Sequence, residues 1–382
     1  MANPRAQTVA AALLGAIWLF GVNSMFGEIW RTGYVAAARD IYSAHDAVLP
    51  VSRAPLLRRY TGVPGLDHLL ALSTVMWANI ADGSAPALSL YAVQFGGQLV
   101  PVFVAVMVEA SRAGNAGGVL SWSVFWGYLM QIFGYAAVMP VYAALHLFGS
   151  PVALASLGRP RARATALRHP SRFGLRVLVP AFALGYFLPS LLMGWPVSSP
   201  ALHQWLNGLW QGFPLYVVAS QQLFARLVAP AQQGHRAILS RAYSWAFYTA
   251  AAVQLCTYAV ILAVKATPGL FPSWAAEAFT FGAVFAPGPF HSSEPLSSMV
   301  AAMHDFYKWD QYVGSAAAIT WAVCLDASSR KAGVSLADWA ILGWDVVRWS
   351  AIAGPAGALV RLLQRRDGRV LLEDTAVEDK RS

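Results

Sequence analysis

Few polar side chains interrupt the apolar stretches of this chain, and those few are the residues that could do chemistry. Asp310 precedes a charge-free stretch of only 15 residues, Gln311–Leu325, which ends at Asp326. A helix of that length covers about 22 Å, against about 30 Å for the hydrocarbon core of a bilayer. One flanking aspartate is therefore expected below the membrane surface, where desolvation favours the protonated acid. A neutral carboxyl suits a general acid, so Asp310 is the first candidate proton donor.

Two other carboxyl groups are candidates for the same role. Glu109 follows the charge-free stretch Gly83–Val108, and the expected topology places it in the same membrane leaflet as Asp310 as a reserve acid. Asp305 lies five residues before Asp310, which is about 140° around a helix, so the two would not face one pocket on a continuous helix. Asp305 is a second candidate acid only if the helix starts after it.

Amide and aromatic side chains near these acids could hold a substrate. Asn207 and Gln211 are spaced i and i+4, which places them on one helical face, where they could orient a substrate oxygen or the acid. Aromatic faces stabilise a positive charge that develops in an apolar site. The aromatic residues best placed to line such a pocket are Trp210, Phe213, Tyr216, Trp309 and Trp321.

Each of these assignments has a structural alternative. Asp310 could simply cap a helix N-terminus. Gly314 and Ala317, on the same face, could form a seam where two helices pack closely. Asn207 and Gln211 could serve as interhelical hydrogen bonds, which are common in membrane bundles. The spacing of the residues leaves these alternatives open.

Metal chemistry has no recognisable motif in this sequence. There is no Asp-Asp-x-x-Asp, no Asp-x-Asp-Asp, no Walker loop and no histidine-rich pattern, and Cys256 and Cys324 lack metal-ligand spacing. Ionisation of a prenyl diphosphate with Mg²⁺ normally uses carboxylates of this kind. The sequence therefore disfavours ionisation of a diphosphate with Mg²⁺.

The elements that must position these residues are membrane helices. The chain is 57% hydrophobic and only 12% charged, against roughly 25% charged residues in a soluble domain. This composition predicts an all-α, polytopic membrane bundle of about seven transmembrane helices, with eight as the alternative. Six charge-free stretches are long enough to span: Ala6–Gly27, Gly83–Val108, Val119–Phe148, Val177–Leu202, Trp205–Ala225 and Ala242–Val264, with Gln311–Leu325 as the seventh.

The basic residues indicate an orientation. With a lumenal N-terminus and seven spans, 23 of the 27 Lys and Arg residues fall on the cytosolic side, as the positive-inside rule requires. The basic excess thus belongs to topology, and nucleic acid is not an expected partner. His68–Ala81 is interpreted as an interfacial or re-entrant segment, and Trp339–Leu363, with Asp345 and Arg348 inside it, as an amphipathic surface helix. Residues 1–364 are expected to form one transmembrane domain, and residues 365–382 a charged, disordered cytosolic tail.

Two regions resemble a family of fungal membrane-bound terpene cyclases, those of the ascofuranone-pathway type and their indole-diterpene-cluster relatives. The first contains Gly-Tyr-Phe-Leu-Pro at Gly185–Pro189, Trp-Pro at Trp195–Pro196 and Trp-Gln-x-x-Pro at Trp210–Pro214. The second contains Trp-Asp at Trp309–Asp310 and Trp-Ala at Trp321–Ala322. The resemblance covers the second half of the chain.

The resemblance implies a cofactor-independent cyclase of the endoplasmic reticulum membrane in secondary metabolism. Such an enzyme protonates an epoxide or olefin on a prenyl chain, often on a meroterpenoid precursor, and guides the cation through ring closure. Asp310 would then donate the proton. The expected partners are a lipophilic prenylated small molecule, membrane lipid and other enzymes of the pathway.

Two other classes of protein remain as alternatives. A membrane transporter usually shows internal repeats and charged residues within its spans, and neither is evident here. A scaffold for pathway enzymes would tolerate loss of every polar residue named above. A prenyltransferase is disfavoured because it needs the diphosphate-binding carboxylates that the sequence lacks.

Overall fold

The computed structural model consists of helices, as the composition predicts, and describes residues 4–154, 166–167, 173–228, 235–295, 297–330 and 334–378. In these ranges no strand forms, and the only β-type pairing is an isolated bridge between Val48 and Pro55. Four helical segments among them are long and apolar enough to cross a membrane: Gln7–Arg31, Pro86–Ala110, Arg236–Ala266 and Leu336–Val370. The predicted count of about seven spans is not confirmed.

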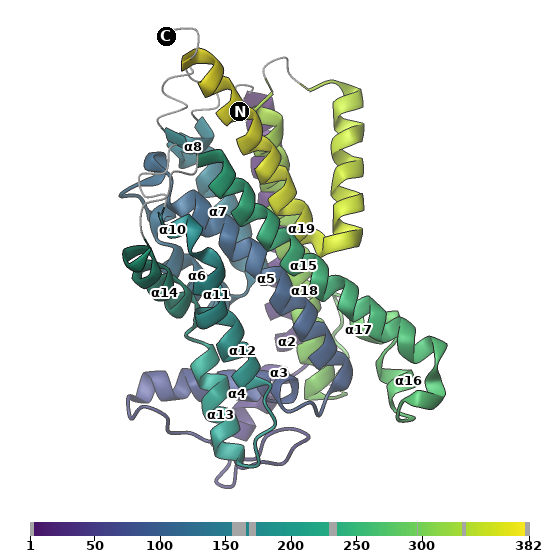
Figure 1. Cartoon of the computed structure of the whole chain (residues 1–382). Coiled ribbons are helices and arrows are strands. Elements are labelled where there is room, and N and C mark those ends of the chain that lie inside the picture. Colours follow the sequence, from purple (N-terminus) through teal and green to yellow (C-terminus); the bar gives the residue numbers. More distant parts are fainter. Residues whose placement is uncertain are drawn as a thin grey trace.

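Three long helices form the centre of the bundle: α5 (Pro86–Ala110), α15 (His235–Ala266) and α18 (Met299–Ser328) (Figure 1). Helices α5 and α18 run in the same direction. Near their first turns the hydroxyl of Tyr91 donates to the carbonyl of Tyr307 at 3.1 Å, and near their last turns Glu109 and Trp321 both contact His146. Helix α18 is longer than the charge-free stretch Gln311–Leu325. It continues through Asp310 and Asp326, which are both buried inside the bundle.

The stretch Val119–Phe148, predicted as one span, forms two short helices, α6 (Ser123–Phe133) and α7 (Tyr135–Gly149). Gly134 between them has φ +83°, a left-handed conformation that glycine adopts without strain. Ser150 after α7 donates to Asn115, which precedes α6, at 2.5 Å. The segment before α6 and the end of α7 therefore lie close together, so this helix pair begins and finishes at the same end of the bundle.

Trp339–Leu363 is not the single surface helix that the sequence predicts. Helix α19 (Leu336–Glu378) folds back on itself at Gly354, which has φ +68°. Gln98 of α5 holds this apex, since its side chain donates to the carbonyl of Ala353 at 3.0 Å and accepts from the N–H of Ala356 at 3.1 Å. A Cβ atom at Gly354 would lie 2.2 Å from Gln98, so only glycine fits this turn.

The tail predicted from residue 365 does not begin there. The second arm of α19 continues as helix through Glu378, and Arg366 and Asp367 are buried against the bundle. Their burial is explained by ion pairs that sequence alone does not reveal, as described below.

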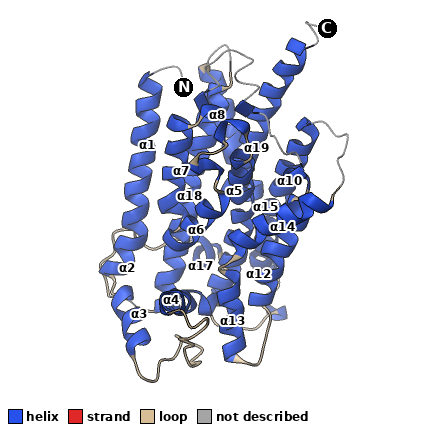
Figure 2. Ribbon diagram, turned by 90° about the vertical axis from the view of Figure 1, so that its left-hand side faces the viewer, coloured by secondary structure: helices blue, strands red, loops and turns tan. Residues whose placement is uncertain are grey.

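The start of α1 (Pro4–Val22) and the end of α19 lie at the same end of the bundle in both views (Figures 1 and 2). A chain that crosses an odd number of times must place these ends on opposite sides. This arrangement therefore does not support the seven-span topology with a lumenal N-terminus and a cytosolic C-terminus. Helix α4 (Pro64–Ala81), which contains the segment predicted to be interfacial or re-entrant, lies crosswise at the other end (Figure 2).

Shorter elements complete the bundle. Proline in the first turn and a serine or threonine cap start several of them; Ser199, for example, accepts from the N–H of Leu202 at the start of α13. These elements are η1 (Asn23–Gly27), α2 (Glu28–Arg31), α3 (Tyr34–Ser43), η2 (Ala113–Asn115), η3 (Val119–Ser121), α8 (Pro151–Leu154), α10 (Phe173–Arg176), α11 (Leu178–Phe182), η5 (Ala183–Phe187), α12 (Leu188–Met193), α13 (Pro200–Trp210), α14 (Phe213–Leu227), η6 (Pro268–Leu270), α16 (Ala275–Ala278) and α17 (Phe281–Phe285).

Candidate functional site

A cavity of about 700 Å³ lies between α4, α5, α12, α13 and α18. It is the larger of two neighbouring cavities, and we call it the apolar cavity. Most of its lining is apolar or aromatic, drawn from segments far apart in the chain. Ligand sites of this size typically combine such a lining with a few polar groups that fix orientation.

Four aromatic rings gather on one wall of the apolar cavity. The ring of Trp77 on α4 lies 4.9 Å from those of both Trp210 and Tyr307, measured between centroids. Tyr186 lies 6.3 Å from Trp210 and donates its hydroxyl hydrogen to the carbonyl of Gly96 at 2.8 Å. Trp210 donates to the hydroxyl of Ser190 at 2.9 Å. These bonds fix the rings of Tyr186 and Trp210. The four rings together could stabilise a cation inside the cavity.

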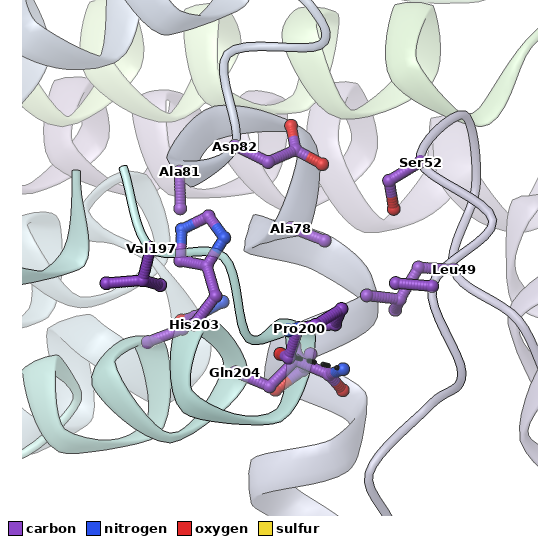
Figure 3. A pocket seen from close by; sticks show the side chains of 12 residues that line it. Leu49, Ser52, Ala78, Ala81, Asp82, Val197, Pro200, His203 and Gln204 are labelled. Atoms are coloured by element: carbon purple, nitrogen blue, oxygen red, sulfur yellow. Dashed lines mark hydrogen bonds between the residues drawn. The ribbon is translucent and has the colours of Figure 1, made fainter. Parts of the chain in front are cut away.

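A second cavity of about 190 Å³ adjoins the first, and we call it the polar cavity. The two cavities share Ala81, Asp82, Val197 and His203 in their linings. In Figure 3, Asp82 stands at the end of α4 above the imidazole of His203, and Leu49 and Ser52 lie on the opposite side. The shared residues therefore mark the place where the two cavities meet.

Asp82 is the carboxyl group that lines both cavities. One of its oxygens accepts from the N–H of Ser84 at 2.9 Å and from the hydroxyl of Ser84 at 2.5 Å. His203 donates from Nε2 to the carbonyl of Met193 at 3.0 Å, which leaves Nδ1 as an acceptor on the neutral ring. The site thus presents one carboxyl group and one imidazole at the place where the apolar and polar cavities meet.

The loop before α4 fixes the position of this helix. The N–H groups of Thr61 and Gly62 donate to the two carboxylate oxygens of Asp67, at 2.6 and 3.0 Å. The hydrogen bond from the Thr61 backbone holds the pKa of Asp67 below its ordinary value. Asp67 thereby anchors the first turn of the helix that carries Trp77 and ends at Asp82.

Asp310, the acid that the sequence favours, lies elsewhere. Its carboxylate accepts from the backbone N–H of Ala136 at 2.7 Å, in the first turn of α7. It lines neither of the two cavities. This geometry matches the capping alternative, except that Asp310 caps a neighbouring helix and not its own.

The cap predicts a measurable contribution to stability. Asp310→Ala leaves the Ala136 N–H without its partner and is expected to lower the free energy of unfolding by about 1 kcal/mol. Asp310→Asn retains an acceptor oxygen and should cost less. Thermal unfolding of the purified variants in detergent compares them, and equal stability of Asp310→Ala and wild type would contradict the capping role.

Glu109 is not near Asp310. It is fully buried and pairs with Arg112 at 2.9 Å and with Arg366 at 2.5 Å. It also accepts from Nε2 of His146 at 3.0 Å, while Nδ1 of that ring accepts from Trp321. Trp321 is eleven residues after Asp310 on α18, so about 16 Å separates the two levels. The predicted convergence of Glu109 and Asp310 in one leaflet is therefore wrong.

Asp305 and Trp309 also lie away from both cavities. Asp305 pairs with Lys308 at 3.3 Å on a continuous helix, so it does not share a face with Asp310. The ring of Trp309 packs on Phe20 at 5.5 Å. Neither residue contacts the space described above.

Asn207 and Gln211, the predicted amide pair, contact each other and a neighbouring helix. Gln211 donates to the side chain of Asn207 at 3.2 Å and accepts from Gln131 of α6 at 2.6 Å. The shared helical face is therefore confirmed, and the bond to α6 fits the interhelical alternative. Asn207 also lines the polar cavity. Among the predicted binding residues Trp210 lines the apolar cavity, whereas Tyr216 and Trp321 line neither.

Several site residues escaped prediction from sequence. Trp77 lies near the end of α4 and Asp82 directly follows it, on a segment predicted to lie at the membrane interface. Tyr186 lies within a predicted span that has no charged residue near it. The available signal for Asp82 was its position as the boundary of the charge-free stretch His68–Ala81. No three His, Cys, Asp or Glu side chains of the described residues cluster as metal ligands would.

The chain belongs to the family defined by the CtvD domain, whose model matches residues 9–371. Curated proteins that are similar to the chain carry the name terpene cyclase. No solved structure is significantly similar to the chain.

Three relatives illustrate the extent of the similarity. Terpene cyclase ascI of Acremonium egyptiacum is 29% identical over 319 residues, covering 81% of this chain and 79% of the relative. Terpene cyclase ctvD of Aspergillus terreus is 25% identical over 366 residues, covering 94% and 98%. Terpene cyclase janA of Penicillium janthinellum is 25% identical over 337 residues, covering 86% and 87%. The family resemblance, which the motifs indicate for the second half of the chain, is thus confirmed over nearly the whole length of the chain.

Proposed function

We propose that the protein is a membrane-embedded terpene cyclase that folds a prenyl chain inside the apolar cavity and starts ring closure by protonation. The observation that carries the proposal is the meeting of one carboxyl group, Asp82, with an aromatic wall in a cavity of about 700 Å³. The names of the relatives support the reaction class.

The proposed reaction conserves mass. The carboxyl of Asp82 gives its proton to an epoxide oxygen or a terminal alkene of the chain, and the C–O bond or the π bond breaks. A neighbouring double bond attacks the electron-poor carbon, which closes the ring and moves the cation along the chain. Loss of a proton to a base restores a double bond. The product is therefore an isomer of the substrate.

The residues around the cavity have separate roles in this proposal. The faces of Trp77, Trp210 and Tyr307 stabilise the migrating cation and exclude water. The polar cavity gives Asp82 a path for renewed protonation, because the carboxyl lines both spaces. Asp310 remains the alternative acid, as the sequence predicts.

Incubation of membranes containing the protein with an epoxidised prenyl-aromatic substrate and EDTA tests the proposal. The expected result is a product of unchanged mass with a new retention time, seen by liquid chromatography and mass spectrometry. Product formation in the presence of EDTA supports a reaction without a divalent metal. A product that forms only after Mg²⁺ is added back contradicts it. No product from several prenyl substrates would favour a transporter or scaffold.

Removal of one aromatic face should slow the reaction. Trp77→Leu is expected to lower turnover about 30-fold, because a desolvated cation–π contact contributes about 2 kcal/mol. Trp77→Phe keeps a π face and should lose less. Trp309→Leu, which removes a tryptophan outside both cavities, is the matched control. Equal activity of the two Trp77 variants would show that the wall provides shape and no cation stabilisation.

A further inference from the structure

A basic cleft lies between the two arms of α19, far along the chain from the cavities above. It has a volume of about 410 Å³. We call it the arginine cleft, and its lining is Asp345, Arg348, Trp349, Arg361, Leu362, Gln364 and Arg365. The turn at Gly354 brings residues 345–349 of the first arm opposite residues 361–365 of the second.

The charges within the cleft do not balance. Asp345 is the single carboxylate of the lining, and it pairs with both Arg348, at 2.6 Å, and Arg365. Arg365 is shared further with Asp326, which also binds Arg330 and Arg369. The lining thus holds three guanidinium groups and one carboxylate.

Arg361 has no carboxylate partner among the residues that the structure describes. Its guanidinium lies 3.9 Å from the ring centre of Phe247 and 5.3 Å from that of Trp349. It donates one hydrogen bond, to Gln364 at 2.9 Å, and its Nε is buried with no partner. A buried donor without an acceptor is costly, so this group is poised for an anion.

The surroundings of the cleft identify the kind of anion. The first arm of α19 exposes Ile341, Trp344 and Val347 on its outer face. Apolar side chains of this kind suit contact with acyl chains, and tryptophan is frequent at the level of lipid headgroups. Guanidinium forks match the geometry of phosphate oxygens. Basic pockets between membrane helices are known to hold anionic headgroups.

We propose that the arginine cleft binds the phosphate of an anionic membrane lipid, with Arg361 and Arg348 as its main donors and the lipid chains along the Trp344 face. The site is separate from the apolar cavity and does not depend on the proposed cyclisation. The lipid would join the two arms of α19 and so stabilise the hairpin that Gln98 holds at its apex.

The full-length protein in bilayer nanodiscs provides the test. Tm is measured in phosphatidylcholine alone, in phosphatidylcholine with phosphatidylinositol, and in phosphatidylcholine with inorganic phosphate. A ligand that binds only the folded state raises Tm. The expected result is a rise with phosphatidylinositol and no comparable rise with inorganic phosphate; an equal rise with both would overturn the lipid assignment.

Two variants locate the effect. Arg361→Gln should weaken the response so that about tenfold more anionic lipid is needed for the same rise. Arg348→Gln, a partly exposed position, provides the same readout if Arg361→Gln does not fold. Arg39→Gln, exposed on α3 at the other end of the molecule, is the matched control and should respond as wild type. An unchanged response in both cleft variants would refute the proposal.

Discussion

Asp82→Asn is expected to lower cyclisation about 10²- to 10⁴-fold, the usual contribution of a general acid. The amide is nearly isosteric with the carboxyl and keeps an oxygen that can accept from Ser84, so the end of α4 should stay in place. Only the transferable proton is lost. Turnover is measured as the rate of formation of the isomer, at equal amounts of correctly inserted protein.

Asp310→Asn is the matched comparison for this experiment. Its carboxylate binds the backbone of α7 and lines neither cavity, so this variant should retain most of the activity. Full turnover of Asp82→Asn together with loss in Asp310→Asn would assign the proton to Asp310, as the sequence predicts. Full turnover in both variants would exclude both carboxyl groups as the donor.

Glu109→Ala is expected to lower the free energy of unfolding by about 3 to 5 kcal/mol, because it leaves buried cations without their partner. Arg112 and Arg366 are almost fully buried, and both pair with Glu109. The network extends through Asp367, which accepts from Arg112 at 2.7 Å and from the hydroxyl of Tyr243 at 2.9 Å. Thermal and denaturant unfolding in detergent measure the loss.

A double-mutant cycle separates this structural role from catalysis. Arg366→Met alone removes one cation, and combining it with Glu109→Gln removes a whole pair. The double variant should lose less free energy of unfolding than the sum of the losses in the two single variants, because no charge is left buried without its partner. Slow turnover of Glu109→Gln at unchanged stability would instead support Glu109 as a reserve acid.

Burial explains why the predicted polar residues and the observed site differ. Buried charges are costly unless they are paired, and Glu109 meets that requirement with Arg112, three residues along the same segment, and with Arg366, which is 257 residues away in sequence. Asp310 meets it with a backbone donor on another helix. Sequence identifies such groups as unusual but does not reveal whether a partner or a substrate compensates them.

The amino-acid sequence by itself determined that the protein is helical, that several stretches are apolar enough for a membrane, and that the chain resembles the terpene cyclase family. These properties follow from composition, from local periodicity and from short motifs, which are all visible along the chain. The shared face of Asn207 and Gln211 was also predictable, since an i, i+4 spacing places both residues on one face of any helix.

Only the tertiary structure decided where the helices turn and what the cavities contain. Gly134 and Gly354 reverse the chain inside apolar stretches, and hydropathy does not register a positive φ. The same turns place the start of α1 and the end of α19 at one end of the bundle. Asp82 and Trp77 reach Trp210, Tyr307 and His203 only through packing of distant segments, because nothing local to α4 specifies its neighbours.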